Sequence, residues 1–226
     1  MIAVFADWPC PGPEGPANEQ ALAFDRDRAH RLLIVPALFE EANRTRRFLV
    51  ETMRRLDAAG IDSFLPDLPG CNESPQEFAA QSLHAWRTAM AQAAAHFAVT
   101  HVLAVRGGAL VFPTSLPGWV LEPVKGATVL RQMLRARTLS AREAGREEDS
   151  ASLLEHGRAE GLDLAGYRCG ASLIAGLETA LPADEGQRTI RQAELGGSAL
   201  WLRAEPGEDA AQSDALAAMI AREIAA

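Results

Sequence analysis

Residues 31–36 read RLLIVP, and this short apolar run decides how the rest of the chain is interpreted. Its length and its lack of polar alternation are typical of a strand that is buried on both faces of a parallel sheet. A strand–helix rhythm follows: helix 44–59 with Gly60 as its stop, strand 61–66, helix 77–98, strand 101–105 and strand 119–122. This alternation predicts an α/β fold, a three-layer sandwich in which helices cover both faces of a mostly parallel central sheet.

Two parts of the chain depart from this rhythm. Residues 1–30 are weakly patterned and rich in proline and glycine, which predicts an irregular arm or a short edge strand. Residues 126–181 carry helical stretches without a further buried strand, and we expect them to form a helical cap insertion over one end of the sheet. The rhythm returns with a strand at 198–203 and a closing helix capped by Ser213. We therefore expect a single domain, residues 1–226, that includes this cap.

Composition narrows the class of protein. The chain has 226 residues, of which 48% are hydrophobic and 23% charged, so it can bury a core and is not a disordered protein. Its formal net charge of −8 argues against a general nucleic-acid binder. No apolar run approaches the roughly 20 residues of a membrane helix, and the first residues lack the pattern of a signal peptide. The widely spaced Cys10, Cys71 and Cys169 do not indicate a disulfide scaffold, so we expect a cytoplasmic protein.

Several blocks of sequence resemble those of α/β-hydrolases. The general resemblance rests on the strand that ends at Pro36, the loop DLPGCNES at 67–74 and the small-residue turn AVRGG at 104–108. More narrowly, the chain resembles the exosortase A system-associated hydrolase 2 proteins of bacteria in the blocks PALFEEANRTRR (36–47), LPDLPGCNES (65–74), AVRGGAL (104–110), WVLEPVKGATVLRQMLRAR (119–137) and LAGYRCGASLIAGLE (164–178). The resemblance implies an α/β-hydrolase-like fold and a link to exopolysaccharide and protein-sorting gene clusters. It implies no substrate.

The catalytic machinery of that fold is not recognisable in the sequence. A serine hydrolase of this type needs a nucleophile at the centre of its elbow and a histidine base near the C-terminus. The elbow centre here is Arg106, whose guanidinium stays protonated and cannot attack a carbonyl carbon. The last histidine is His156, and the chain beyond residue 203 is too short for a final strand and a histidine loop. We therefore expect a fold truncated at its C-terminal end, no Ser-His-Asp triad and no catalytic residue.

Charged residues at the carboxyl ends of the strands form the candidate site instead. Glu40 and Glu41 follow the first buried strand and Arg106 follows the third, and in this fold the two loops face each other. We expect Arg106 to pair with one of these carboxylates and to plug or reshape the pocket. The alternative is that both glutamates point to solvent at a helix N-terminus, where the helix dipole favours acids. Further candidates for the pocket are Asn43, Arg46 and Cys71.

Three classes of function stay open. The first is a non-catalytic binding or accessory protein in the exosortase-linked pathway. The second is an ester or thioester hydrolase of unconventional composition, which would use Cys71 or Ser74 with a histidine from elsewhere in the chain, although inert thiols and structural serines are commoner at such places. The third is a small-molecule or lipid binder that uses the cleft beneath the cap.

Cofactors and partners follow from the motifs. No metal-ligand spacing and no nucleotide-binding motif is present, so we expect no metal and no cofactor. The partners we expect are a small molecule or another protein, with a homodimer as one option, and neither nucleic acid nor a membrane span.

Overall fold

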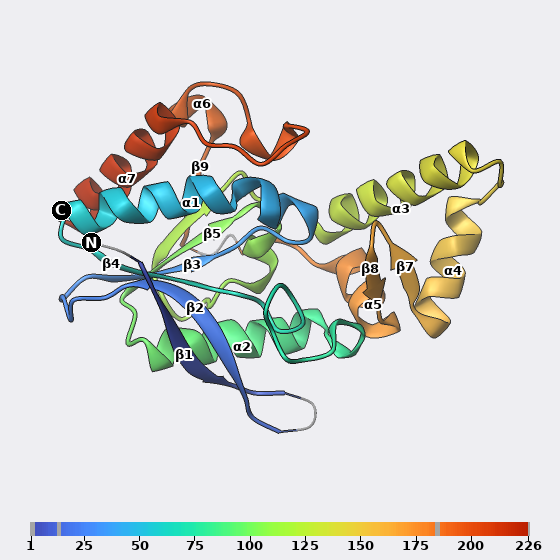
Figure 1. Ribbon diagram of the computed structural model, residues 1–226, viewed down its shortest axis with the longest axis horizontal. Coiled ribbons are helices and arrows are strands. Elements are labelled where there is room, and N and C mark those ends of the chain that lie inside the picture. The colour runs from blue at the N-terminus through green and yellow to red at the C-terminus, as the bar shows by residue number, and fades with distance from the viewer. Residues whose placement is uncertain (1–2, 13–14, 184–185, 226) are drawn as a thin grey trace.

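The computed structural model describes residues 3–12, 15–183 and 186–225 of the chain. Within these ranges a seven-stranded sheet runs in the order β1-β2-β4-β3-β5-β6-β9 (Figure 1). β2 is antiparallel to both β1 and β4, and all other neighbours are parallel. The strands are β1 (Val4–Cys10), β2 (Ala17–Phe24), β3 (Arg31–Val35), β4 (Asp62–Pro66), β5 (His101–Val105), β6 (Gly118–Leu121) and β9 (Arg188–Ile190). The helices that flank the sheet are α1 (Glu40–Ala58), α2 (Leu83–His96), α6 (Gln192–Leu195) and α7 (Ala210–Ile224). The expected α/β architecture is confirmed.

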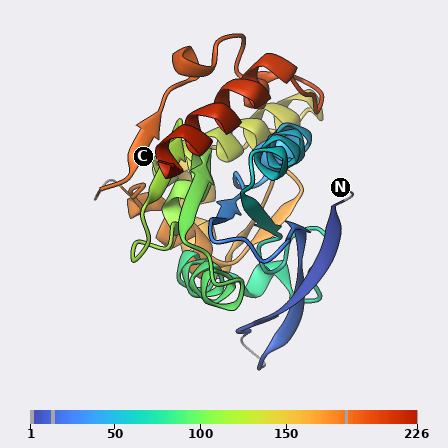
Figure 2. The same cartoon turned by 90° about the vertical axis from the view of Figure 1, so that its left-hand side faces the viewer.

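The sheet lies between two helical layers (Figure 2). α1 and α7 cover one face and α2 covers the other. Successive side chains of β3 alternate between these layers: Leu32 and Ile34 belong to the core under α1 and α7, whereas Leu33 and Val35 belong to the core under α2. The RLLIVP run is uniformly apolar because a strand between two helical layers has no solvent face.

The first thirty residues are more regular than expected. β1 and β2 form an antiparallel hairpin that joins the sheet through β4, so the irregular arm is wrong, although β1 does form one edge of the sheet. The buried side chains of the hairpin include Trp8 and Phe24, but several of the others are small, as at Cys10, Ala21 and Ala23. Such small residues carry little of the period-two hydrophobic signal that identifies a strand. Residues 1, 2, 13 and 14 of this stretch lie outside the described residues.

The other edge of the sheet also differs from expectation. The strand predicted at 198–203 is wrong: Leu200–Leu202 form a single 3₁₀ turn, η3, and Leu202 is 75% exposed. The strand that pairs with β6 is β9, whose three residues, RTI, are too short to show a period. The predicted cap at Ser213 is wrong as well. α7 begins at Ala210, the Asp209 side chain accepts a hydrogen bond from the backbone N–H of Gln212, and Ser213 is buried within the helix.

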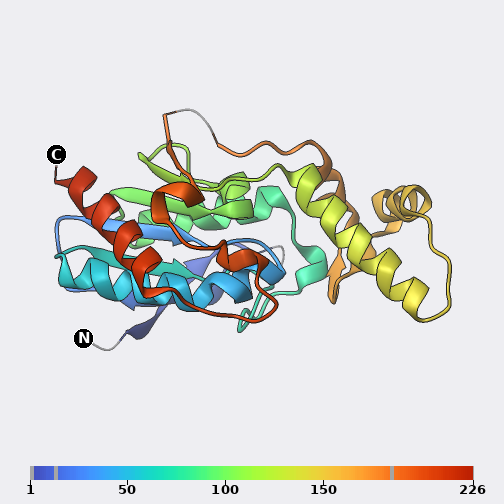
Figure 3. The same cartoon turned by 90° about the horizontal axis from the view of Figure 1, so that it is seen from above.

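Residues 126–179 lie together at one end of the sheet, beyond the carboxyl ends of the parallel strands (Figures 1 and 3). Within this segment α3 (Gly126–Glu143), α4 (Ser150–Glu160) and α5 (Ala171–Thr179) surround a small hairpin of β7 (Leu162–Leu164) and β8 (Tyr167–Cys169). The hairpin turns on Ala165 and Gly166, both with positive φ, as a two-residue turn requires. Tyr167, which follows this turn, is therefore carried back towards the sheet.

The helix predicted at 77–98 is divided in two. A 3₁₀ turn, η1 (Phe78–Ala80), precedes α2, and Ser82 caps α2 by accepting a hydrogen bond from the backbone N–H of Ala85. In the described ranges no helix combines the length and the apolar character that crossing a membrane requires.

Candidate functional site

The turn after β5 has the geometry of a nucleophile elbow. Arg106 directly follows the strand with φ 53°, a left-handed conformation that is unusual for a bulky residue, and it opens the 3₁₀ turn η2 (Arg106–Val111). Gly108 is required here, because a Cβ at this position would lie 2.3 Å from the backbone oxygen of Pro36. The turn thus packs directly against the end of β3 and presents residue 106 at the carboxyl edge of the sheet.

The Arg106 side chain is held on all sides. Its Nε and Nη2 donate hydrogen bonds of 3.0 and 3.1 Å to the two carboxylate oxygens of Glu41, and its Nη1 donates one of 3.0 Å to the backbone oxygen of Glu122. The guanidinium carbon lies 4.6 Å from the centroid of the Trp201 ring, within the range of a cation–π contact. Arg106 is only 8% exposed. All three of its nitrogens are therefore engaged by the protein itself.

The two glutamates at the start of α1 have different partners. Glu41 receives the paired contact from Arg106, whereas Glu40 accepts a hydrogen bond of 2.6 Å from Arg44 at the surface. Arg44 also donates a hydrogen bond of 3.0 Å to the backbone oxygen of Trp201, which fixes the residue that covers Arg106. The Glu41 carboxylate lies beside the elbow, where a hydrolase gathers N–H donors around a developing oxyanion, and a negative charge there opposes such a charge.

Two cavities open at this edge of the sheet. The elbow cavity, of about 200 Å³, is lined by Gly107, Glu41, Trp201 and one side of α3 that includes the buried Val129 and Met133. The α1 cavity, of about 240 Å³, lies between the start of α1, the loop after β4 and the tip of the β7–β8 hairpin. Phe39 and Tyr167 line both cavities, and their rings lie 5.3 Å apart between centroids.

The remaining candidates predicted from the sequence meet at the α1 cavity, whose lining includes Asn43, Arg46 and Cys71. The six sequence-predicted residues therefore divide into two groups: Arg106, Glu41 and Glu40 at the elbow, and these three in the α1 cavity.

A second arginine–carboxylate pair lies in the α1 cavity. Arg46 Nη1 donates a hydrogen bond of 2.6 Å to Oδ1 of Asp67, and the Asn72 side-chain amide donates another of 2.6 Å to the same oxygen. Asp67 is 5% exposed, so these donors compensate the charge of a buried carboxylate. Among the described residues Arg46 makes no further hydrogen bond, and the side chain of Asn43 makes none.

Aromatic side chains join the hairpin tip to the sheet. Tyr167 packs against Phe39 and Phe78 with ring centroids 5.3 Å away in both cases, and Phe39 and Phe78 both contact Trp86 of α2. Phe39 has φ 57°, a second bulky residue in a strained backbone conformation at this edge. Burial raises the pKa of the Tyr167 hydroxyl, so that it stays a hydrogen-bond donor at neutral pH.

Neither Cys71 nor Ser74 has the surroundings of a nucleophile. Burial, with the charges of Asp67 and Glu19, raises the pKa of the Cys71 thiol to about 12, which disfavours the reactive thiolate. The Ser74 hydroxyl donates to Glu19 at 2.7 Å and accepts from the backbone N–H of Gly70, so it holds its own loop in place. None of the five histidines, all of which are described, bonds to either residue or lines the elbow cavity or the α1 cavity.

A metal centre finds no support in the part of the chain that the structure describes. Within those ranges no group of three or more His, Cys, Asp or Glu side chains is placed to hold an ion.

Four residues of the site were not identified from the sequence: Phe39, Asp67, Tyr167 and Trp201. Asp67 directly follows β4 at the carboxyl edge of a parallel sheet, and that position could have identified it. Trp201 was assigned to a strand, and Tyr167 reaches the site only through the fold of the 126–179 segment.

Comparison with known proteins identifies the fold. The sequence matches no family model and no curated protein. Among solved structures, DcsB in complex with a substrate analogue aligns with 97% of this chain and 99% of its own, with a TM-score of 0.56 at 11% identity. Smu.1393c from Streptococcus mutans aligns with 98% of this chain and 97% of its own, with a TM-score of 0.51 at 12% identity.

Structures that carry the name hydrolase align with a smaller part of this chain. A putative hydrolase from Agrobacterium vitis S4 aligns with 62% of this chain and 61% of its own, with a TM-score of 0.45 at 12% identity. The chain spans between 39% and 61% of the length of this and two further hydrolase structures. The strand order, the elbow and the full-length matches together show an α/β-hydrolase-like fold, and at these identities they show the fold alone.

Proposed function

We propose that this α/β-hydrolase-like protein binds a small molecule at the carboxyl edge of its sheet without hydrolysing it. One observation carries the proposal: the elbow position holds Arg106, whose guanidinium is engaged by Glu41, the Glu122 backbone and the Trp201 ring. A guanidinium has no lone pair available for attack, and each of its three nitrogens here already donates a hydrogen bond to the protein. The two cavities at this edge supply the space for a ligand.

We also propose that residues 126–181 act as a cap over this edge, within a single domain. The contacts of Tyr167 with Phe39 and Phe78 support a closed cap, because they seat the hairpin tip on the loops after β3 and β4. A ligand in either cavity would then lie partly beneath the cap.

The resemblance to the exosortase A system-associated proteins supports an accessory role in exopolysaccharide synthesis or protein sorting. We place this role in the cytoplasm, which the unpaired state of the three cysteines supports. Deletion of the gene should alter exopolysaccharide output or surface-protein sorting, and an unchanged output of both would remove this part of the proposal.

The hydrolase question has a direct test. The purified protein is incubated with a fluorophosphonate probe and with p-nitrophenyl esters of increasing chain length, beside an active serine hydrolase as control. We expect neither labelling nor turnover above the buffer rate. Turnover that disappears in Cys71→Ala or Ser74→Ala would show a hydrolase of unconventional composition instead.

A further inference from the structure

The α1 cavity is separate from the place where a hydrolase of this fold would bind its substrate. Its lining contains none of Glu41, Gly107 and Trp201, which line the elbow cavity, and Phe39 and Tyr167 are shared by the two linings. It is therefore a site that the hydrolase fold does not by itself explain.

The cavity has an apolar floor. Leu49 of α1, Leu65 of β4 and Leu68 of the following loop line it, and all three are at most 3% exposed. Phe39 and Phe78 add aromatic walls. A volume of about 240 Å³ lies below the range of roughly 300–1,000 Å³ that holds drug-sized ligands, so the cavity suits a small apolar group.

The polar part of the lining consists mainly of unused donors. Arg46 spends one N–H on Asp67, and its Nε and Nη2 have no partner among the described residues. Asn43, Tyr167 and Arg168 also line the cavity, and their side chains have no hydrogen-bond partner in the described ranges. Arg168 also lines a neighbouring cavity beside Asp163 and Glu160. Asp67 accepts two hydrogen bonds, both at Oδ1, and its Oδ2 makes none among the described residues.

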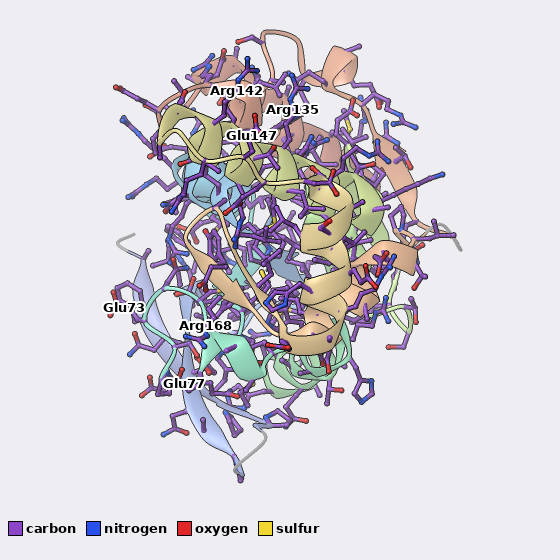
Figure 4. All side chains as sticks on the ribbon, turned by 90° about the vertical axis from the view of Figure 1, so that its right-hand side faces the viewer. Glu73, Glu77, Arg135, Arg142, Glu147 and Arg168 are labelled. Atoms are coloured by element: carbon purple, nitrogen blue, oxygen red, sulfur yellow. The ribbon has the colours of Figure 1, made fainter. Side chains whose placement is uncertain are left out.

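The formal charges of the lining residues, like the unused donors, favour an anionic ligand. Arg46 and Arg168 contribute two positive charges and Asp67 one negative charge, so the lining carries a net charge of +1 (2 − 1). Glu73 and Glu77 lie near Arg168 in Figure 4, but they are exposed and do not line the cavity.

We infer that the α1 cavity binds a small amphipathic carboxylate. Its head group accepts hydrogen bonds from Arg46, Asn43 and Arg168, and its short apolar chain lies on the leucine floor. Asp67 and Asn72 act as positioning residues, because the Asp67 carboxylate fixes one edge of the Arg46 guanidinium and leaves the rest of it free for an anion. The inference rests on the proposed function, since it names the ligand class of a protein that binds without hydrolysing.

Calorimetric titration with three ligands of equal chain length tests the ligand class. Hexanoate, hexanol and hexylamine differ only in the head group. We expect saturable binding of hexanoate, with hexanol at least fivefold weaker and hexylamine without measurable binding, because a hydrogen bond to a charged group strengthens binding about ten- to a hundredfold. Equal binding of hexanol, or tighter binding of hexylamine, would overturn the inference.

Matched variants test whether hexanoate binds in the α1 cavity. Arg168→Ala should weaken hexanoate binding about fivefold, a reduced effect for an exposed arginine. Arg135→Ala is the control, because Arg135 is also an exposed arginine whose side chain has no partner among the described residues, and it lies on α3 away from Arg168 (Figure 4). Ala42→Phe, which fills the cavity from α1, should abolish binding while circular dichroism shows that the variant is folded. If Ala42→Phe does not fold, the comparison of hexanoate affinity between Arg168→Ala and Arg135→Ala tests the location of the site by itself.

The outcomes separate this inference from the proposed function. An equal loss in Arg135→Ala and Arg168→Ala, unchanged binding in a folded Ala42→Phe, or no heat with any of the three ligands would overturn the inference. The probe and ester assays judge the proposed function independently, since they report hydrolysis whether or not hexanoate binds.

Discussion

Two arginine–carboxylate pairs lie at the same edge of the sheet, and they are built differently. At the elbow, Arg106 uses all three nitrogens, carries Trp201 on one face and is 8% exposed. In the α1 cavity, Arg46 uses one nitrogen, and its side chain is 33% exposed. In the first arrangement the guanidinium is buried and each of its nitrogens bonds to the protein, whereas the second presents a charged donor to a cavity.

The difference shows that one edge of a sheet can have a blocked site, at Arg106, and an open one, at Arg46. A fully satisfied buried pair stabilises the fold only as a unit, and removal of one partner leaves an uncompensated charge. A partly satisfied arginine costs less to disturb and is free to bind an anion. Changes to the elbow should therefore affect stability most, and changes to the α1 cavity should affect binding most.

The largest effect is expected at Glu41. Glu41→Gln removes the carboxylate that accepts two hydrogen bonds from Arg106, and it should lower the free energy of unfolding by about 2–4 kcal/mol in urea denaturation. Glu40→Gln is the matched control, because its pair with Arg44 is exposed and should cost less than about 1 kcal/mol. If the two variants had equal stability, the elbow pair would not be structural.

The second largest effect on stability is expected at Trp201. Trp201→Ala removes a side chain that is 7% exposed and covers the Arg106 guanidinium, with an expected loss of about 3 kcal/mol in the same assay. Leu202→Ala, at the next position but 75% exposed, should change stability by less than about 0.5 kcal/mol. Similar losses for both residues would mean that the contact with Arg106 adds nothing.

Substitution of Arg46 should lower the free energy of unfolding less than substitution of Glu41 or Trp201. Arg46→Met leaves Asp67 with only the Asn72 amide as a side-chain donor, and we expect a loss of about 1–2 kcal/mol together with the loss of anion binding. Arg47→Met, which breaks an exposed pair with Glu208, should leave both quantities nearly unchanged. A loss at Arg46 as large as that at Glu41 would remove the distinction between the two pairs.

The smallest effect concerns pH and Cys71. The pKa of its thiol is raised, mainly by burial, from 9.0 to about 12, so the unfolded chain releases this proton at lower pH than the folded protein does. The stability that the neutral thiol contributes is therefore complete below pH 9.0 and is lost as the pH rises from 9.0 towards 12. Cys71→Ser should lose less stability than the wild type over that range. Rapid alkylation of Cys71 by iodoacetamide near neutral pH would contradict its position as a half-buried, protonated thiol.

The sequence predicted the fold best where a strand or a helix face is buried along its whole length. The RLLIVP run, the HVLAV strand at β5 and the helical periods of α1 and α2 predicted the centre of the sheet, because a buried strand or an amphipathic helix leaves a dense hydrophobic pattern. It was least informative towards the two sides of the sheet, where β2, the second strand, packs partly with alanines and the edge strand β9 has three residues.

The sequence predicted which residues belong to the site better than it predicted how they are arranged in space. The position of Arg106 after a buried strand, opposite Glu40 and Glu41, suggested an ion pair, but only the three-dimensional arrangement selects Glu41 and sends Glu40 to Arg44. Asn43, Arg46 and Cys71 were expected near that pair. The Phe39 and Tyr167 rings, which lie between them and the elbow, depend on a hairpin formed more than a hundred residues later in the chain.

A crystal structure of the protein with hexanoate would compare the two regions directly. Our account predicts the ligand in the α1 cavity, with its carboxylate within hydrogen-bond distance of Arg46 and its chain against Leu49 and Leu65, while the contacts of Arg106 with Glu41 stay intact. Hexanoate bound beside Gly107, with Arg106 released from Glu41, would contradict the account, because the elbow would then be the open site.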